Sequence, residues 1–453
     1  MKKLSFTFLF SLILNGIAIS RDIDVFTLGN FFEIEYVSDP QISPEGKRVV
    51  YVRNFADIMT DRRYSNLWII NRDGSNQRPL TTGHRNDRSP RWSPDGTQLI
   101  YVSNMEGSSE VYMRWMDSGQ TARLTNVQYS PGNIEWSPDG KMIAFTMFVK
   151  SSPSKPAKMP EKPEGAKWAD PPKVIDKMIY RADGAGYQEN GFTHIFTLPE
   201  DGGTPRQITS GDYHHGGQLQ WTPDGKKIIF SANRRTDWEY EPNDSDLYEI
   251  SVSDGSLKQI TKRQGPDNSP VLSPDGKKIA YIGYDDRYQG YQVTHLYIMN
   301  RDGSNSKMIT KSLDRSIASP IWSGDGKGVY VSYNDKGNGK VAYVPVKGKV
   351  KIVTKNLGGT SIGRPYSSGS FTVAKDGNIA YTTSLPDRPA DIAIVGMKDG
   401  IANKITSLND DLFGHKELAE VEEIWYKSSH LSLIHISEPT RPRLISYAVF
   451  CLK

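Results

Sequence analysis

A short pattern returns through most of the chain and constrains the fold more than any other feature. It joins a Ser-Pro-Asp-Gly turn to an alternating apolar strand, as in residues 91–102, RWSPDGTQLIYV. Proline at the second turn position presets φ and glycine at the fourth tolerates the exit geometry, so each copy predicts a tight turn between antiparallel strands. Clear copies lie at 91–102, 135–146, 220–231, 271–282 and 321–332, and weaker ones at 41–52 and 371–382.

The residues after each copy predict the rest of the repeating unit. A third strand such as 66–75, NLWIINRDGS, ends in an Asp-Gly turn, and a fourth strand closes on Leu-Thr or Ile-Thr, as at Leu124-Thr125. Four strands make one propeller blade, and radial repetition leaves only short, protected sheet edges. The sequence therefore predicts an all-β fold, a seven-bladed β-propeller with four antiparallel strands per blade, over residues 39–409. The repeated tryptophans are expected to pack between neighbouring blades.

The spacing of the copies is interrupted once. Between Trp136 and Trp221 the chain holds one blade and an insertion at about residues 150–190, within blade three. The insertion is rich in Pro and Lys, which predicts an extended excursion without a core of its own.

The later part of the insertion, YRADGAGYQENG at 180–191, combines three glycines with a few polar side chains. This composition suits a mobile loop that presents a few polar groups. Simple loop packing is one interpretation of Arg181, Asp183 and Tyr187; the equal alternative, that they contribute to substrate binding or to a domain interface, is what the family resemblance described below implies.

The N-terminal residues predict an export signal. Lys2 and Lys3 precede an apolar run that ends in small residues, so cleavage is expected near Ser20, with residues 21–38 as a short segment before the propeller. The run is too short for a bilayer span, and no later segment approaches the length that a span needs. The protein is therefore expected to be exported, periplasmic or secreted, without a membrane span.

Charge and cysteine content argue against several classes of function. The formal charge of +4 disappears once the leader and the residues from 431 onward are left out, so it gives no support for nucleic acid as a partner. Cys451 is the only cysteine, so the body of the protein has neither a disulfide framework nor a thiolate metal site. No metal and no other cofactor is expected, and the oligomeric state stays open.

These WD40-like repeats resemble the propellers of TolB-like periplasmic proteins and of prolyl oligopeptidase family serine peptidases. Four further stretches resemble the acylaminoacyl-peptidase and dipeptidyl-peptidase branch of the second family: FFEIEYVSDPQISPEGKRVVYVRN, KPEGAKWADPPKVIDKMIYRADGAGY, GGTSIGRPYSSGSFTV and LNDDLFGHKELAEVEEIWYKSS. The resemblance runs from about residue 23 to residue 429. It implies an α/β-hydrolase domain after the propeller, with residues 410–429 leading into it.

After His430 the amino-acid sequence no longer resembles the rest of the protein. Residues 431–441, LSLIHISEPTR, and 445–452, ISYAVFCL, can each be encoded by one end of a transposon adapter used in sequencing libraries. We therefore interpret residues 431–453 as translated adapter and the hydrolase domain as missing. The chain itself is expected to contain no catalytic residue and to be inactive.

One match to a catalytic motif needs a separate test. Gly359-Thr360-Ser361-Ile362-Gly363 fits G-x-S-x-G, and Asp411 and His415 follow in the order of a triad. The next residues, RPYSSGSF, are broken by proline and turns, so no helix can begin there to form a nucleophile elbow. We interpret Ser361 as part of the link between blades six and seven.

The other ionisable residues carry little functional signal. His214 and His215 are adjacent and would point to opposite faces of a strand, while His84, His194 and His295 are scattered along the chain. The acidic run at 237–246, DWEYEPNDSD, lacks the spacing of an EF-hand loop and is expected to be a solvated loop at a blade edge.

The family resemblance, together with the leader, implies the substrate-gating propeller of an exported serine exopeptidase that hydrolyses short peptides through an acyl-enzyme. The Ser-Asp-His triad that the resemblance implies would lie in the missing domain. The alternative is a stand-alone periplasmic TolB-like propeller that binds partner proteins, although the strand EEIWYKSS leading outward argues against it. A propeller lectin has no specific support.

Overall fold

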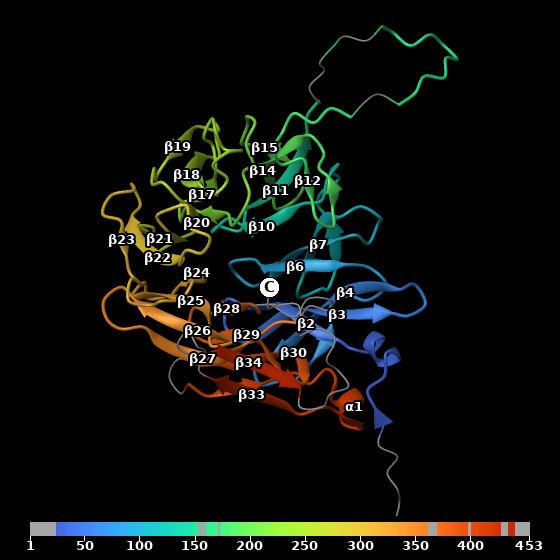
Figure 1. Ribbon diagram of the computed structural model, residues 1–453, viewed down its shortest axis with the longest axis vertical. Helices are drawn as coiled ribbons and strands as arrows, with labels where there is room; N and C mark the ends of the chain where they lie inside the picture. Colours follow the sequence, from blue (N-terminus) through green and yellow to red (C-terminus); the bar gives the residue numbers. More distant parts are fainter. Residues whose placement is uncertain are drawn as a thin grey trace, which may run out of the picture.

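The computed structural model describes residues 24–152, 157, 160–170, 173–360, 369–396, 400–426 and 434–439. Strands dominate this part of the chain, and its helical segments are the short 3-10 turn η1 (Gly29–Phe32) and α1 (Asp410–Phe413). Neither is long and apolar enough to cross a membrane. Figure 1 shows the sheets following one another around a ring in the order of the sequence.

Five sheets contain four antiparallel strands each. Within each sheet, the strands lie side by side in the order in which they occur along the chain. Their strands are β2 (Tyr36–Ile42), β3 (Arg48–Asp57), β4 (Arg62–Asn71) and β5 (Arg78–Pro79); β6 (Asp87–Trp92), β7 (Gln98–Ser103), β8 (Glu110–Trp115) and β9 (Thr121–Arg123); β10 (Gly132–Trp136), β11 (Met142–Lys150), β14 (Gly191–Pro199) and β15 (Arg206–Gln207); β16 (Gln220–Trp221), β17 (Lys227–Ala232), β18 (Asp246–Ser251) and β19 (Leu257–Gln259); and β20 (Asp267–Leu272), β21 (Lys278–Gly283), β22 (His295–Asn300) and β23 (Lys307–Met308).

A larger sheet holds eight strands in two groups of four. The groups are β24 (Ala318–Trp322), β25 (Gly328–Asp335), β26 (Asn338–Pro345) and β27 (Lys351–Leu357); and β28 (Phe371–Val373), β29 (Ile379–Leu385), β30 (Arg388–Val395) and β31 (Ala402–Lys404). A single pair, Leu357 with Thr383, joins them. We name the five sheets and the two groups blades one to seven in chain order. The all-β fold and the four-stranded antiparallel blades are confirmed, whereas the number seven depends on dividing this sheet and stays a prediction.

The repeated tryptophans lie between neighbouring blades, as the sequence predicts. Trp136 is only 5% exposed, belongs to a cluster shared with blade two, and donates from Nε1 to the backbone oxygen of Arg91 at 3.1 Å. Trp322 makes the same bond to Val271 at 2.9 Å, and Trp92 repeats it with blade one. Each of these indoles combines apolar burial with a hydrogen bond that crosses from one blade to the next.

The Ser-Pro-Asp-Gly turns are held by their own side chains. In the first clear copy, the Ser93 hydroxyl donates to Asp95 at 2.6 Å and accepts the backbone N–H of Gln98 at 2.9 Å, while Gly96 N–H closes the turn on Ser93. The Ser93 hydroxyl and the Thr97 backbone N–H lower the pKa of Asp95. The same Ser–Asp or Thr–Asp bond recurs in four other copies.

The Leu-Thr and Ile-Thr pairs close the blades through the threonine hydroxyl. In blade two, Thr125 Oγ1 accepts the backbone N–H of Val111 at 2.9 Å. Five further blades repeat this bond at 2.8–3.0 Å, with Thr81, Thr209, Thr261, Thr310 and Thr406 as acceptors. The hydroxyl therefore satisfies a buried backbone donor, which would otherwise cost about 1–3 kcal/mol.

The segments before and after the ring lie side by side. Asn409 exchanges two hydrogen bonds with the backbone of Glu35 at 2.9 and 2.8 Å, and Phe26 stacks on Phe413 with ring centroids 5.9 Å apart. The chain thus enters and leaves the ring at one place, next to blades one and seven. The strands of these two end segments are β1 (Asp24–Val25), which pairs in parallel with β32 (Lys416–Glu417), and β33 (Val421–Tyr426), which pairs with β34 (Ile434–Pro439).

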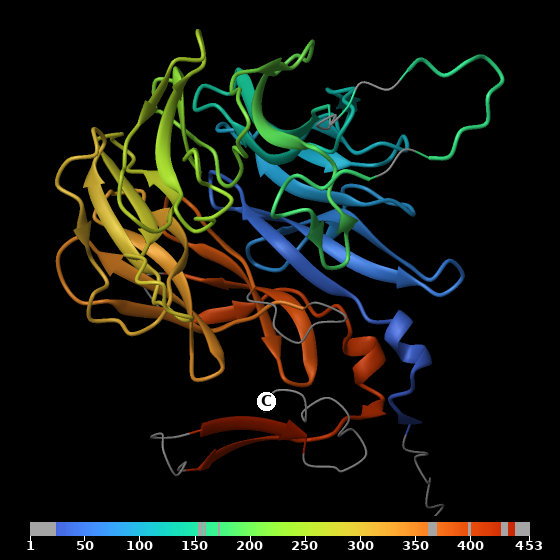
Figure 2. The same cartoon turned by 45° about the horizontal axis from the view of Figure 1, so that its top comes forward.

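Two predictions concern the ends of the chain. Figure 2 shows the β33–β34 ribbon, in dark red, outside the ring. β34 lies within the residues that we interpret as translated adapter, and its pairing does not test how those residues arose. The leader at residues 1–20 lies outside the described residues, so both interpretations, like the domain boundaries, stay predictions.

Candidate functional site

The strand order within a blade sends one set of loops to one edge of the ring. Antiparallel strands alternate in direction, so the connection between the second and third strands lies at the edge where the first strand begins. The link from blade to blade, the segment before β2 and the segment after β31 lie there too. We call this edge the loop rim; besides those links and end segments it contains the connections 58–61, 104–109, 151–190, 233–245, 284–294, 336–337 and 386–387.

Exposed apolar side chains gather at the loop rim. Among the described residues, the large hydrophobic side chains left exposed lie in the rim connections, at the end of β29 or in the two end segments, except for Leu257, Ile352 and Ile401. Met59 is 87% exposed and Tyr291 is 74% exposed. Gathered exposed apolar surface marks interaction sites in soluble proteins, so the loop rim is the candidate interaction surface.

The three residues singled out from the sequence lie on a small hairpin near the end of the insertion. Its strands are β12 (Arg181–Ala182) and β13 (Gly186–Tyr187), with Arg181 opposite Tyr187 and Asp183 in the turn. All three side chains are exposed, and the Nζ of Lys173 lies 3.1 Å from the centre of the Tyr187 ring. The fold brings them together at the loop rim, and Figure 1 shows the insertion looping away from the ring.

The base of the insertion is tied to the ring. The Tyr129 hydroxyl donates to Glu189 at 2.6 Å, and the ammonium of Lys150 lies 3.3 Å from the same carboxylate. Gly191 begins β14 with φ 150°, and a Cβ there would lie 2.3 Å from the backbone oxygen of Val149. A residue with a side chain would not fit, so glycine fixes where the chain re-enters the blade.

Two histidines that the sequence analysis treated as unrelated meet beside this base. The rings of His194, on β14, and His215, in the link to blade four, stack with centroids 5.2 Å apart. They are 6% and 0% exposed. The sequence spacing does not show that His194 meets His215, because the contact depends on the link folding back over the start of β14. His214 and His215 lie on a loop, not a strand. We call this contact between blades three and four, with His194, His215, Trp221 and Arg234, the histidine interface.

The surroundings of these histidines disfavour their charged forms. Burial, followed by the charge of Arg234, lowers the pKa of His215 to about 3. Burial also lowers the pKa of His194, with the neighbouring His214 adding to the effect. Arg234 Nη1 donates to Nε2 of His215. Both imidazoles are therefore neutral at pH 7, and a metal would have to displace a guanidinium to reach His215.

The acidic run at 237–246 is only partly solvated, so the prediction of a solvated loop is wrong for its last residues, 244–246. Asp244 and Asp246 are 5% and 4% exposed, because the run ends by entering β18 between blades four and five. Asp244 accepts the backbone N–H of Gly265 at 2.9 Å and pairs with Arg235 at 2.6 Å. Burial raises the pKa of Asp246 to about 6.

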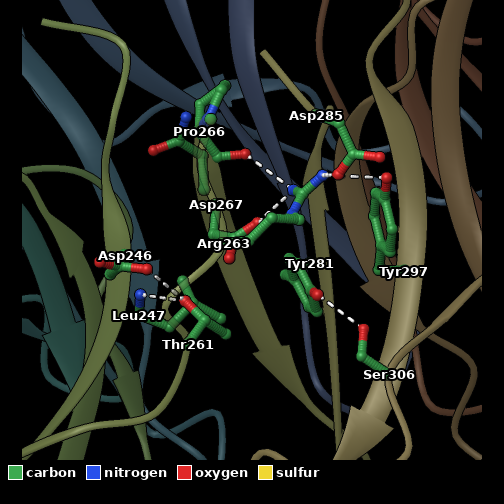
Figure 3. A network of polar contacts seen from close by, with 12 residues as sticks. Asp246, Leu247, Thr261, Arg263, Pro266, Asp267, Tyr281, Asp285, Tyr297 and Ser306 are labelled. Atoms are coloured by element: carbon green, nitrogen blue, oxygen red, sulfur yellow. Dashed lines mark hydrogen bonds and ion pairs between the residues drawn. The ribbon is translucent and has the colours of Figure 1, made fainter. Parts of the chain in front are cut away.

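Arg263 forms the centre of a polar network in blade five (Figure 3). Its Nε donates to Asp267 at 3.1 Å, and its Nη1 donates to Asp285 and to the hydroxyl of Tyr297, both at 3.0 Å. Nη2 donates to the backbone oxygen of Pro266 at 3.1 Å. Protein groups thus occupy every nitrogen of the guanidinium, and Arg263 acts as a structural link, not as an anion-binding residue.

A depression opens at the loop rim near this network. Its volume is ≈ 360 Å³, at the lower end of the range of small-ligand pockets. It lies between blades four and five and is lined by Gly216, Gly217, Ser231, Ala232, Asn233, Pro242, Asn243, Ser245, Pro266 and Asn268. Small and polar groups predominate in this lining.

The structure says little about the remaining predictions, which concern the match to a catalytic triad and metal binding. Ser361 lies outside the described residues, so its interpretation as part of a link stays a prediction. Asp411 lies on α1 and is exposed. In the part of the chain that the structure describes, no group of three or more His, Cys, Asp or Glu is placed to hold a metal ion.

Comparison with known proteins gives matches to peptidases and to TolB. A family model for the TolB beta propeller domain matches residues 27–159, and one for the dipeptidyl peptidase IV (DPP IV) N-terminal region matches residues 183–284. The chain is 28% identical over 417 residues to the peptidase YuxL of Bacillus subtilis, covering 88% of this chain and 61% of that protein. It is 24% identical over 412 residues to dipeptidyl-peptidase 5 of Porphyromonas gingivalis, covering 88% and 58%. The chain therefore spans about three fifths of the length of these relatives.

A TolB relative and two solved structures complete the comparison. The Tol-Pal system protein TolB of Francisella tularensis is 28% identical over 287 residues, 60% of each chain. The acylaminoacyl peptidase of Pyrococcus horikoshii superposes with a TM-score of 0.67 at 17% identity, covering 90% of this chain and 57% of that one. The β-propeller domain of the trilobed protease from Pyrococcus furiosus gives 0.58 at 18% identity, covering 84% and 99%. The predicted resemblance to the propeller region of the prolyl oligopeptidase family is confirmed.

Proposed function

We propose that this chain is the substrate-gating propeller portion of an exported serine exopeptidase that hydrolyses short peptides. One observation carries the proposal: the exposed apolar side chains gather at the edge where the chain leaves the ring. A domain that follows β33 would bury this surface on folding. Each Å² of apolar area buried would stabilise the contact by about 25 cal/mol. The relatives named above, which are longer than this chain, are called peptidase and dipeptidyl-peptidase, and this supports the same assignment.

The chemistry would belong to that following domain. In a Ser-Asp-His triad the serine attacks the peptide carbonyl, the histidine takes its proton, and the aspartate holds the histidine in place. The propeller would contribute the other wall of the chamber and admit only chains narrow enough to pass the loop rim. This chain by itself is expected to be inactive.

The hairpin at the end of the insertion is proposed to contact the substrate or the following domain. Arg181 and Asp183 carry opposite charges at the loop rim, and Tyr187 adds an aromatic face. In an active full-length enzyme, alanine at Arg181 or Asp183 should raise KM about tenfold or more, because a charge-assisted hydrogen bond is worth roughly 1.5–3 kcal/mol. Alanine at the exposed Lys162 of the same insertion is the control. Unchanged kinetics in both test variants would reduce the hairpin to loop packing.

Export is part of the proposal and rests on the leader pattern at residues 1–20. The measurement is fractionation of the native host, followed by N-terminal sequencing of the mature protein. We expect a new N-terminus near Ser20 in a periplasmic or secreted fraction. Full-length protein that stays in the cytoplasm would contradict export without touching the peptidase assignment.

The decisive experiment is to read the source DNA across the codon of Ser429 with long reads prepared without transposon tagging. If the reading frame continues, the complete protein is expressed and labelled with a fluorophosphonate. It is then assayed on dipeptidyl, acylaminoacyl and prolyl chromogenic substrates, with the present chain as the control. We expect labelling and hydrolysis only in the complete protein, and slower cleavage of a folded protein than of short peptides. A complete protein with no label and no hydrolysis would remove the proposal.

The second candidate is a stand-alone periplasmic TolB-like propeller that binds partner proteins. The specific observation in its favour is the match of residues 27–159 to the TolB beta propeller domain, together with the TolB relative. In this case the apolar loop rim would bind another protein instead of a following domain. A reading frame that ends shortly after residue 453 would favour this candidate. Chemical crosslinking of the exported chain in cells should then capture a partner through the loop rim.

A further inference from the structure

The contact between blades five and six repeats the histidine interface with one decisive change. His295 occupies the place of His194, and Thr310 accepts the N–H of Leu296 as Thr209 accepts that of Ile195. In the link to the next blade, the N–H of His215 donates to the backbone oxygen of Thr193 at 2.8 Å. The N–H of Ile317 donates to Thr294 at 2.9 Å in the same way. We call this contact, with His295, Ile317 and Trp322, the isoleucine interface.

The position of Ile317 is built for an apolar side chain. Ile317 is 2% exposed and belongs to a cluster with Leu296, Trp322 and Val331. His215 fills the matching place beside Phe230, with ring centroids 5.8 Å apart. The histidine interface therefore carries an imidazole where its repeat carries a hydrocarbon.

Hydrogen bonding fixes the protonation of His215. Arg234 has only donors, so the Nε2 that it contacts must be the acceptor and the ring proton must lie on Nδ1. Within the described residues, neither this Nδ1 nor Nε1 of Trp221 has a hydrogen-bond partner, although both residues are buried. In the isoleucine interface the matching indole of Trp322 is bonded. The histidine interface thus contains two buried N–H donors, His215 Nδ1 and Trp221 Nε1, without a described acceptor.

A second proton has no favourable place on His215. It would bind at Nε2 and turn the acceptor of the Arg234 bond into a donor that faces a donor. The titratable and charged groups around the two buried rings are Arg234 after β17, His194 on β14, His214 and Asp212 in the link, and Lys177 of the insertion next to His214. The other histidines are neutral at pH 7, so a new positive charge meets the cations Arg234 and Lys177 and a single acid, Asp212.

We propose that the histidine interface is an acid-sensitive joint: protonation of His215 separates the link between blades three and four from β14 and frees the base of the insertion. The two structures are directly connected. Lys177 of the insertion lies 4.3 Å from the centre of the Phe192 ring, and His214 packs on the same ring at 5.2 Å. Loss of the link would take His214 off the Phe192 ring, on which Lys177 also lies. This joint does not depend on the peptidase assignment.

The test is hydrogen–deuterium exchange of the full chain at several pH values from 7.5 to 5, corrected for the intrinsic pH dependence of amide exchange. Segments 192–197 and 208–219 report the histidine interface, and segments 293–298 and 309–317 report the isoleucine interface as the internal control. We expect protection in the first pair to fall by up to about tenfold per pH unit below about pH 6.5, where an exposed histidine gains its proton. Protection in the control pair should fall less, because Ile317 does not titrate and the histidine of that contact, His295, is only partly buried, although burial lowers its pKa too.

Variants separate titration from general weakness of the interface. His215→Ile copies the isoleucine interface and should keep more of its protection at pH 5 than wild type, in which both His215 and His194 have pKa values lowered by burial. His215→Leu provides a second apolar replacement if isoleucine does not fold. His295→Gln removes an imidazole from the control interface and should leave the fall in protection at the histidine interface unchanged. The proposal is overturned if both interfaces lose protection equally in wild type, or if His215→Ile or His215→Leu loses it as wild type does.

Discussion

The histidine and isoleucine interfaces are two copies of one contact, and their differences lie in a few buried atoms. Both place a tryptophan, a closing threonine and a histidine at matching positions: Trp221, Thr209 and His194 in one, and Trp322, Thr310 and His295 in the other. The backbone bonds of the link agree within 0.1 Å, at 2.8 and 2.9 Å. The repeat therefore specifies the geometry of the contact without specifying its chemistry.

The chemistry differs at the most buried point. One interface buries Ile317 and bonds its indole, while the other buries His215 and has an indole and an imidazole nitrogen that find no partner among the described residues. Unsatisfied buried donors cost free energy, so the histidine interface is expected to be the weaker of the two. Because the ring has similar contacts all round, one weak contact determines where it opens first.

The strongest way to break this comparison is to exchange the decisive residue. Ile317→His should lower the free energy of unfolding by about 3 kcal/mol at pH 7, because it removes apolar burial and adds an unsatisfied polar group. Urea unfolding followed by circular dichroism measures the loss. Ile317→Val, which only shortens the side chain, is the control and should cost about 1 kcal/mol. Equal costs for histidine and valine would show that the position does not select for an apolar group.

The pH dependence of stability should differ between wild type and His215→Leu. His215 titrates at about 3 in the folded chain and near 6.5 when unfolded, so its contribution is fully present above about pH 6.5 and is lost as the pH falls toward 3. From pH 7 to pH 5 this amounts to about 2 kcal/mol. The stability gained by His215→Leu over wild type should therefore grow by that amount, as measured by urea unfolding at each pH.

Buried carboxylic acids oppose this trend in both proteins, so the test is the difference between the two stability curves. Burial raises the pKa of Glu135 to about 7 and that of Asp246 to about 6. Their folded pKa values lie above the unfolded ones, so they add stability as the pH falls. Since both proteins contain them, their effect cancels in the comparison. A difference that stays constant from pH 7 to pH 5 would contradict the titration of His215.

The comparison also shows what the sequence could reveal. The turn at Ser93 to Gly96 and the alternating strand after it are local patterns, and they correctly predicted the blades because backbone and side chain favour the same structure there. The Leu-Thr and Ile-Thr pairs were visible as a repeat, and aligning the copies at Thr209 and Thr310 would have placed His194 and His295 at one position. The burial of His215 has no such local signal, because it depends on a link folding over another blade.

In the candidate site, too, local groupings of residues could be predicted from the sequence, whereas burial that depends on the fold could not. Arg181, Asp183 and Tyr187 could be grouped from the sequence because a short turn brings them together. Asp246 was assigned to solvent with the acidic residues before it, yet it is the first residue of β18 and turns into the contact with blade five. A run of acidic residues can begin in solvent and end in the core. The residue at which it becomes buried is known only once the start of the strand is known.

The closing threonines of the two interfaces, Thr209 and Thr310, are predicted to contribute equally to the free energy of unfolding. Thr209→Val and Thr310→Val each remove the acceptor of a buried backbone N–H, from Ile195 and Leu296 respectively. Each should cost about 1–3 kcal/mol, and the two costs should agree because the two bonds are alike. Urea unfolding of both variants measures this, with Thr→Ser at each site as the control that keeps the hydroxyl. A much smaller cost at Thr209 would mean that its interface is already partly open at pH 7.

The smallest expected effect concerns the indole nitrogens. Trp322→Phe removes a donor that bonds Val271 at 2.9 Å, whereas Trp221→Phe removes a donor without a described partner. Both variants lose the same ring volume, so the difference between them isolates the hydrogen bond. Trp322→Phe should cost about 1 kcal/mol more than Trp221→Phe in urea unfolding at pH 7. Equal costs would mean that Trp221 Nε1 is bonded in solution, and the weakness of the histidine interface would then rest on His215 alone.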